Sequence, residues 1–471
     1  SVLSRGLFTL LACGPIAAFA AGTTPYTAEA MWGLARLGNP TLSPDGALAV
    51  VPVTRYDLGT NKGSTDLWTI PAAGGAARQL TSDKANDTAP AFSPDGRWVA
   101  FLSKRGDDEQ NQIYVIAVDG GEAKRLTNVP VGAGAFKWFP DGKHIAFVAD
   151  VWPDLVKWED QGTRLKERAE AKSSAKVWER APIAYWDHFL DDREPHLFSI
   201  PLAGGETTAI TRGSGYWLSK QEYSTSSYDI SPDGTEVAFV ADRDRSGIDP
   251  NDDIIVIPAC GCKPARNLNA DSIADESNPV YSPDGRYLAY SQKRTPRFYA
   301  DTQRLMLLER ASGLTRGLTE QWDRSADGLV WASDSKSIYG QIDDAATSRI
   351  YRFALTGGAP RAVTGASSFS GLEVTGKVAI ALRQSFSEPA ALVRLDLAKG
   401  AITKLSDFND GALASLAMGK VESVTYRGAR GDPIQMWVIY PPGFDPAKKY
   451  PVYMLLHGGP HNGIQDALTY R

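Results

Sequence analysis

A glycine-rich segment near the C-terminal end, His457-Gly458-Gly459-Pro460-His461, carries the clearest chemical signal of the chain. It follows the apolar run Val452–Leu456, which predicts a buried strand that enters a tight loop. Glycines let backbone N–H groups approach a developing oxyanion without an intervening Cβ. Each preorganised donor of this kind contributes about 2.7–4 kcal/mol to acyl transfer. The segment therefore indicates an oxyanion-hole loop.

An oxyanion loop needs a nucleophile beside it. In α/β-hydrolases the Ser, Asp and His of the triad all come later in the chain than this loop, and here only residues 461–471 follow Pro460. The Gly-x-Ser-x-Gly elbow is absent, because Gly213-Ser214-Gly215 and Ser368–Gly371 have the wrong spacing. We expect the triad to lie outside these 471 residues, and this fragment alone to be inactive.

The composition narrows the class of protein. A hydrophobic content of 43% and a charged content of 22% are typical of a folded protein. The net charge of −5 argues against a nucleic-acid partner. We expect no cofactor and no metal, since Cys260-Gly261-Cys262 supplies only half of a zinc site. We interpret these cysteines as a turn, either with free thiols or with a local disulfide.

Residues 1–21 are typical of an export signal. Arg5 precedes the apolar stretch Leu7–Ala12, and Ala18-Phe19-Ala20 forms a small-x-small cleavage site. An alternative is a lipoprotein signal, Leu10–Cys13, with Cys13 as the lipid anchor. No later segment approaches the roughly 18 apolar residues of a membrane span. We expect a periplasmic or secreted protein.

A repeated turn and strand dominates the body of the chain. Each copy is a Pro-Asp-Gly turn that favours type I geometry, followed at once by an alternating strand. The copies are Ser43–Gly46, Ser93–Gly96, Phe139–Gly142, Ser231–Gly234 and Ser282–Gly285, with Ser333-Asp334-Ser335 as a degenerate sixth. The strand Lys377–Ile380 is interpreted as a seventh copy with an eroded turn.

A second repeat confirms the number of units. It runs strand, glycine turn, strand, and then an apolar residue followed by a residue with a polar side chain. Its seven copies end at Leu80-Thr81, Leu126-Thr127, Ile210-Thr211, Leu268-Asn269, Leu318-Thr319, Val363-Thr364 and Leu405-Ser406. A period of ~40–50 residues is typical of four-stranded propeller blades. The sequence predicts an all-β seven-bladed propeller over residues 22–410, followed by the first strands of an α/β-hydrolase domain.

An insertion interrupts the repeat at residues 151–195. It is charged and compatible with a helix over Arg164–Glu170, and aromatic at Trp178, Tyr185, Trp186 and Phe189. One interpretation is a solvated helical flap. The other is a projection over the propeller face that helps to form a substrate chamber, as long insertions in compact repeats are often functional.

Residues 411–471 are interpreted as the N-terminal part of an α/β-hydrolase domain. Val421–Tyr440 is expected to form a hairpin, and Lys449-Tyr450-Pro451 to launch the strand into His457. A propeller followed by this arrangement resembles the prolyl oligopeptidase family of serine peptidases. The His-Gly-Gly-Pro-His form is similar to the acylaminoacyl peptidase and dipeptidyl peptidase 5 branch, as is Tyr185–Phe189 before His196-Leu197-Phe198.

The resemblance implies roles for individual residues. The Gly459 N–H would be an oxyanion donor, Gly458 would shape the loop, and His457 would orient it. In dipeptidyl members a carboxylate captures the substrate's α-ammonium group, for which Glu159 and Asp187 are candidates. His461 is a candidate at the substrate entrance. Short peptides are the expected substrates, cleaved near the N-terminus, with access gated by the propeller.

A second class of function stays open. Binding propellers without catalytic activity, such as that of the periplasmic Tol–Pal system, use similar Ser-Pro-Asp-Gly repeats and bind a protein partner. The stretch Val421–Arg471 favours the peptidase, because a binding propeller needs no hydrolase strand. The unfinished hydrolase segment is expected to expose Val452–Leu456 and an unpaired edge. A homodimer stays open as well.

Overall fold

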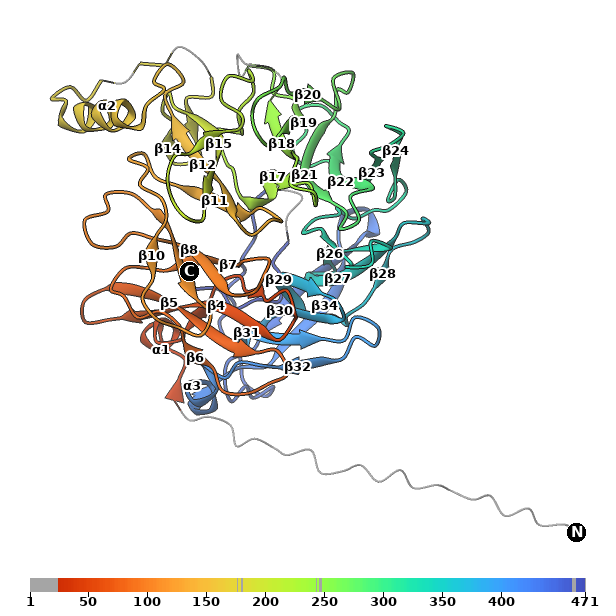
Figure 1. Cartoon of the computed structure of the whole chain (residues 1–471). Coiled ribbons are helices and arrows are strands. Elements are labelled where there is room, and N and C mark those ends of the chain that lie inside the picture. The colour runs from red at the N-terminus through yellow and green to blue at the C-terminus, as the bar shows by residue number, and fades with distance from the viewer. Residues whose placement is uncertain are drawn as a thin grey trace, which may run out of the picture.

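Seven antiparallel sheets are arranged around a common axis in the computed structural model (Figure 1), which describes residues 24–459, except 176, 179, 180, 243 and 245–247, and residues 463–470. The predicted seven-bladed propeller is confirmed. The first blade contains β2 Arg36–Leu37, β3 Thr41–Leu42, β4 Leu48–Asp57, β5 Lys62–Pro71 and β6 Arg78–Gln79; the second contains β7 Thr88–Phe92, β8 Trp98–Ser103, β9 Gln112–Ala117 and β10 Lys124–Arg125. The third contains β11 Gly134–Trp138, β12 His144–Val151, β15 Glu194–Pro201 and β16 Thr208–Ala209; the fourth contains β17 Tyr228–Ile230, β18 Glu236–Asp242, β19 Asp252–Pro258 and β20 Arg266–Asn267. The fifth contains β21 Asp275–Tyr281, β22 Tyr287–Lys293, β23 Arg304–Glu309 and β24 Thr315–Gly317; the sixth contains β25 Val330–Trp331, β26 Ser337–Asp344, β27 Thr347–Ala354 and β28 Arg361–Ala362; the seventh contains β29 Ser368–Thr375, β30 Val378–Ser385, β31 Glu388–Leu395 and β32 Ile402–Lys404.

Each Ser-Pro-Asp-Gly turn connects the first strand of a blade to the second (β3 to β4 in the first blade), and hydrogen bonds between nearby residues hold the turn. In the second blade, Ser93 Oγ donates to Asp95 Oδ1 at 2.6 Å and accepts from the Trp98 N–H at 3.0 Å. Gly96 takes a φ of +70°, a conformation that glycine adopts at little cost. The Ser93 hydroxyl, followed by the Arg97 side chain and N–H, lowers the pKa of Asp95 to about 2.

The second repeat ends in a side chain that binds the neighbouring strand of its own blade. Thr81 Oγ1 accepts a hydrogen bond from the Leu67 N–H at 3.0 Å, and Thr127 Oγ1 accepts one from Ile113 at 2.9 Å. The other five blades place the same contact at Thr211, Asn269, Thr319, Thr364 and Ser406. Because all seven blades form this hydrogen bond, every copy of the second repeat ends in a residue whose side chain can accept one.

The hydrophobic core lies between neighbouring blades rather than within one sheet. A separate cluster of buried side chains fills each junction between two blades. The cluster at the closing junction joins Leu42, Val51 and Ile70 of the first blade to Ile380 and Leu392 of the seventh. Among the described strands, none of the first blade enters the sheet of the seventh. Side-chain packing therefore closes the ring.

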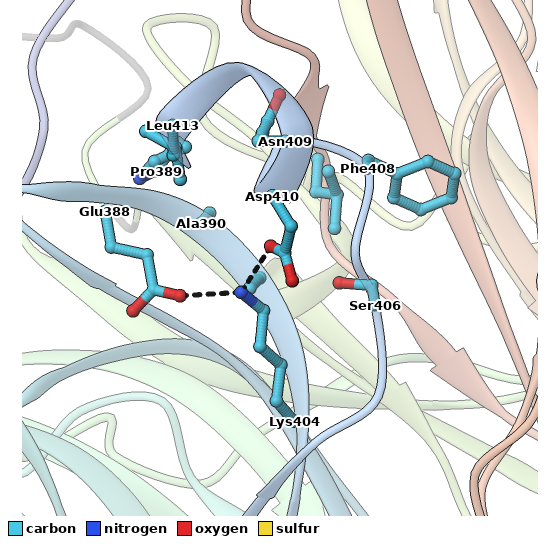
Figure 2. Close-up of a pocket in the computed structure, with 11 residues that line it drawn as sticks. Glu388, Pro389, Ala390, Lys404, Ser406, Phe408, Asn409, Asp410 and Leu413 are labelled. Atoms are coloured by element: carbon cyan, nitrogen blue, oxygen red, sulfur yellow. Dashed lines mark hydrogen bonds and ion pairs between the residues drawn. The ribbon is translucent and has the colours of Figure 1, made fainter. Parts of the chain in front are cut away.

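Polar contacts support this closure (Figure 2). Helix α3 (Asp410–Ser415) begins after Asn409, whose side chain bonds to the backbone of Ala35. Lys404 Nζ bridges Glu388 Oε1 at 2.8 Å and Asp410 Oδ1 at 2.6 Å. The cavity among these residues holds only about 10 Å³, which is room for one water. The junction is therefore structural.

Few described elements lie outside the blades. Apart from α3 and the helix and hairpin of the insertion, they are α1 Ala28–Trp32, the parallel pair β1 Thr24–Pro25 and β33 Leu416–Ala417, the short helices Thr225–Ser227 and Ala429–Gly431, and the hairpin of β34 Val421–Arg427 and β35 Pro433–Ile439. Cys260 and Cys262 form a disulfide in the outer turn of the fourth blade. No described helix has both the length and the hydropathy required to cross a bilayer.

The prediction of a buried strand at Val452–Leu456 is wrong for this structure. These residues form no strand, and their side chains are 72–91% exposed. Their apolar character requires covering neighbours to become a buried strand, and among the described residues β34 and β35 pair only with each other. The exposure of Val452–Leu456, by contrast, agrees with the expectation that these residues stay uncovered.

Candidate functional site

The candidate oxyanion loop follows the β34–β35 hairpin and the extended segment after it. His457 is exposed, and its Nδ1 atom lies 3.2 Å from the carbonyl oxygen of Gly458. Gly459 has a φ of +62°, which a side chain would strain. Pro460 and His461 lie outside the described residues. The backbone conformation at Gly459 thus requires glycine, while the role of its N–H as a donor stays a prediction.

The segment after the loop is bound to the propeller. The Asp466 N–H donates to the Ala346 carbonyl at 2.9 Å, and the Phe386 N–H donates to Asp466 Oδ1 at 2.8 Å. Trp437 of β35 donates to the Ile464 carbonyl at 2.9 Å and packs edge-on against Phe386, with 5.2 Å between ring centroids. These contacts fix Gly463–Tyr470 across the sixth and seventh blades.

The insertion emerges on this same face. Ala346 and Phe386 lie in the connections between the second and third long strands of their blades, and residues 152–193 form the corresponding connection of the third blade. In a propeller these connections all leave at one end of the blades. The insertion and the segment around Asp466 are therefore on one face, which we call the loop face.

Most of the exposed large apolar side chains of the propeller also gather on the loop face. They are Leu58, Val156, Val177, Ile183, Trp186, Phe189, Ile248, Ile273, Phe298 and Tyr299. A partner that covers the loop face would bury these side chains.

The insertion consists of helix α2 (Trp158–Glu170) and a hairpin of β13 (Ala184–Tyr185) and β14 (His188–Phe189). The helix is held to the blade by Gln161, whose side chain accepts from the Trp152 N–H and donates to the carbonyls of Trp152 and Leu155. Trp158 packs against Phe198 of β15, with 4.9 Å between ring centroids. The helix is thus a packed element rather than a loose flap.

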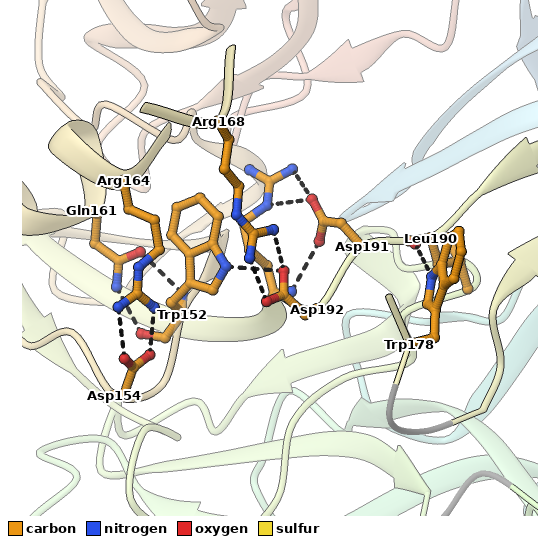
Figure 3. A network of polar contacts seen from close by, with 10 residues as sticks. Trp152, Asp154, Gln161, Arg164, Arg168, Trp178, Leu190, Asp191 and Asp192 are labelled. Atoms are coloured by element: carbon orange, nitrogen blue, oxygen red, sulfur yellow. Dashed lines mark hydrogen bonds and ion pairs between the residues drawn. The ribbon is translucent and has the colours of Figure 1, made fainter. Parts of the chain in front are cut away.

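Charged side chains join helix α2 to Asp154 and Asp192, which come before and after it in the insertion (Figure 3). Arg168 binds both oxygens of Asp192 at 2.6 and 2.7 Å, and Asp192 also accepts from Trp152 Nε1 at 3.0 Å. Arg164 binds Asp154 in the same two-bond manner. Such planar pairs fix orientation as well as charge.

The structure separates the two proposed ammonium-binding carboxylates. Glu159 is exposed in the first turn of α2. Asp187 lies at the tip of the β13–β14 hairpin, fully exposed beside Trp186, with His188 Nδ1 at 3.4 Å. No contact with His457–Gly459 is recorded for either residue within the described part of the chain.

Sequence reasoning missed a buried polar group beneath the insertion. Burial raises the pKa of Asp150 at the end of β12, against the opposing effects of the Arg193 charge and the Tyr223 hydrogen bond. The Tyr223 hydroxyl donates to Asp150 Oδ2 at 3.2 Å. Nearby, Tyr185 of the hairpin donates to Glu222 at 2.9 Å. No motif links these residues, so only the folded structure reveals them.

Comparison with known proteins gives consistent relatives. A family model described as the Tricorn protease N-terminal β-propeller domain matches residues 62–160. The chain is 28% identical to dipeptidyl-peptidase 5 of Porphyromonas gingivalis over its whole length and 69% of the relative's. It is also 28% identical to dipeptidyl-peptidase 5 of Porphyromonas endodontalis, over 94% of this chain and 64% of that protein.

Solved structures share the fold. Acylaminoacyl peptidase from Pyrococcus horikoshii aligns with a TM-score of 0.73 and 16% identity, over 95% of this chain and 64% of that one. The β-propeller domain of the Trilobed protease from Pyrococcus furiosus aligns with a TM-score of 0.55 and 14% identity, over 80% of this chain and 99% of that one. This chain therefore spans about two thirds of the peptidases it matches. The predicted resemblance to dipeptidyl-peptidase 5 proteins is confirmed, and the likeness to acylaminoacyl peptidase shows a shared fold.

Proposed function

We propose that this chain supplies the propeller and the oxyanion loop of an exported serine exopeptidase that cleaves short peptides near their N-terminus. The observation that carries the proposal is the 28% identity to dipeptidyl-peptidase 5 over the whole of this chain. Two further features support it: the glycine conformation at Gly459, and the anchoring of the following segment to the loop face through Asp466.

In this proposal the loop face is the wall of the substrate chamber. The rest of a hydrolase domain would cover the apolar side chains that gather there, Val452–Leu456 included. The insertion would restrict entry, because its helix is fastened to the blade and its hairpin holds the exposed Trp186 beside Asp187. Extended peptides fit such a chamber, whereas folded proteins are excluded by size.

The remaining parts of the proposal concern the exopeptidase specificity and the location. A carboxylate near the chamber would bind the free α-ammonium group of the substrate and set the cleavage position. Of the two candidates, Asp187 is favoured by its place among aromatic side chains, where an extended peptide could also stack. Export follows from residues 1–21, with lipidation of Cys13 as the alternative to cleavage.

The test uses two fluorogenic substrates with the same sequence, one with a free and one with an acetylated N-terminus, and the full-length protein. Asp187→Asn is expected to raise KM for the free substrate about tenfold, by loss of a charge-assisted contact, and to leave the acetylated substrate unaffected. Glu159→Gln tests the other candidate in the same way, and Glu206→Gln, on an exposed glutamate outside the insertion, is the matched control. If neither Asp187→Asn nor Glu159→Gln changes KM, or both substrates respond equally, Asp187 is not the ammonium site.

A further inference from the structure

One cavity lies away from the loop face, between the fourth and fifth blades. Its volume is about 620 Å³, within the range of small-molecule sites. Residues of the outer strands β20 and β24 line it, and these two strands lie at the rim of the propeller (Figure 1). Val256, Leu288 and Leu308 give it apolar walls. Three arginines, Arg266, Arg286 and Arg310, lie around them.

Two of these arginines already have partners. Arg310 donates to Glu236 Oε1 at 3.2 Å and to the Gly285 carbonyl at 2.7 Å, and Tyr281 donates to the same Glu236 oxygen at 2.6 Å. Arg286 lies 4.0 Å from Glu309. Arg266 makes no side-chain hydrogen bond or ion pair to any described residue. The lining therefore has one positive charge in excess.

Arg266 holds a position in its blade that is also an arginine in three other blades, and neither Arg266 nor Arg361 of the sixth blade bridges to a neighbouring blade through a described contact. Arg266 lies three residues before Asn269, the side chain that caps the neighbouring strand. In the first blade the residue in this position is Arg78, which donates to the Val118 and Asp119 carbonyls of the second blade. In the fifth blade Arg316 binds the Leu355 carbonyl of the sixth. These two arginines join neighbouring blades.

At the fourth blade Arg266 makes no hydrogen bond to a described residue of the next blade, and the cavity lies beside it instead. Arg266 pairs across the sheet with Val256, whose buried side chain packs toward the fifth blade. Cross-strand partners share one face of a sheet, so the guanidinium lies on the cavity side. A guanidinium above apolar walls suits a ligand that has a carboxylate and an apolar body.

We propose that this cavity binds a small organic carboxylate with an apolar body, its carboxylate paired with Arg266 and its body against Leu288 and Leu308. The site is formed by the rim of the fourth and fifth blades. Its ligand would bridge the fourth and fifth blades, as Arg78 bridges the first and second.

The test is isothermal titration calorimetry of the full-length protein with 4-phenylbutyrate. We expect saturable binding, no comparable binding of the neutral 4-phenylbutyramide, and none of acetate. Arg266→Gln is expected to raise the dissociation constant about tenfold or more, while Arg266→Lys retains most of the affinity because it keeps the charge. Thr315→Trp is expected to block the site by filling it, with the charge unchanged.

The matched control is Arg361→Gln. Arg361 holds the same register position in the sixth blade, is likewise exposed, and does not line the cavity. The proposal is overturned if 4-phenylbutyrate gives no binding heat up to about 10 mM, if the amide binds equally well, or if Arg361→Gln weakens binding as much as Arg266→Gln. Circular dichroism of each variant establishes that the propeller is folded.

Discussion

The side-chain amide of Asn409 forms two hydrogen bonds with the backbone of Ala35, 374 residues earlier in the chain. Its Oδ1 atom accepts from the Ala35 N–H at 2.8 Å, and its Nδ2 atom donates to the Ala35 carbonyl at 2.9 Å. Both residues are buried. Because no described strand is shared between the first and seventh blades, this pair substitutes for part of a sheet ladder at the closure.

Asn409→Leu is expected to lower the free energy of unfolding by about 1–3 kcal/mol, because it leaves the Ala35 N–H and carbonyl buried without partners. Denaturant unfolding measures the change. Asn128→Leu, on an exposed side chain, is the control and is expected to shift the unfolding free energy by less than about 0.5 kcal/mol. Equal effects of the two substitutions would mean that the closure does not depend on this pair.

Glu276 makes stability depend on pH. Its side chain is fully buried in β21. Its Oε1 atom accepts hydrogen bonds from the side chains of Ser272 and Gln292, at 2.9 Å each. Its Oε2 atom has no hydrogen-bond partner among the described residues. Burial raises its pKa to about 7. A raised pKa means that the folded state binds the proton more tightly than the unfolded state. This contribution to stability is therefore complete below the unfolded pKa and is lost as pH rises through 7.

Glu276→Gln should therefore stabilise the protein at pH 8, by about 1–3 kcal/mol, and have little effect at pH 5. Thermal unfolding followed at both pH values checks this. Glu206→Gln, on an exposed glutamate, should change neither value. A Glu276→Gln effect that is the same at both pH values would contradict ionisation as its cause.

Gln161 is expected to hold the insertion in place. Gln161→Leu removes three hydrogen bonds from the backbone of Trp152 and Leu155, so α2 should detach from the blade more often. Trypsin should then cut after Arg164 or Arg168 about tenfold faster, as the population of the open form increases. Glu167→Leu, on an exposed position of the same helix, should leave the rate unchanged. Unaltered cleavage of Gln161→Leu would show that the packing of α2 is sufficient without this side chain.

Much of the fold could be predicted from the sequence because its signals are local. The Ser93–Gly96 turn is made by bonds within six residues, and Thr81 caps a strand 14 residues away. Residues this close in sequence leave a repeating pattern. The Asn409–Ala35 pair leaves none, because its partners lie at opposite ends of the propeller. The perturbed pKa of Glu276 likewise depends on burial, which its neighbours in sequence do not reveal.

The candidate site was predictable only in part. The glycine at position 459 is recognisable from its motif, and the positive φ shows why a glycine stands there. The run Val452–Leu456 was expected to be buried because it is apolar, yet burial requires covering elements, and the described chain supplies none. Arg266 carried no signal, since an arginine in an outer strand is ordinary and only the cavity beside it, which the folded structure reveals, distinguishes it.

The proposed oxyanion role of Gly459 has a direct kinetic consequence. Gly459→Pro removes the N–H donor and, because proline cannot adopt a φ of +62°, also changes the loop backbone, so kcat for a fluorogenic dipeptide is expected to fall by about 100- to 1000-fold or more in the full-length protein. The control is Gly463→Ala, at a position where a Cβ would meet no atom within 4 Å, and it should stay within about threefold of the unmodified enzyme. A Gly459→Pro enzyme with unchanged kcat would remove Gly459 from the proposed site.

The central claim is that this chain belongs to a serine peptidase, and the most direct measurement is made on the protein from its native source. Intact mass is recorded before and after treatment with a serine-directed phosphonate, together with hydrolysis of the dipeptide substrate. We predict a mass well above 50.9 kDa, addition of one phosphonate, and loss of hydrolysis in proportion to labelling. A mass at or below 50.9 kDa with neither labelling nor hydrolysis would contradict the account and favour a propeller that binds a protein partner.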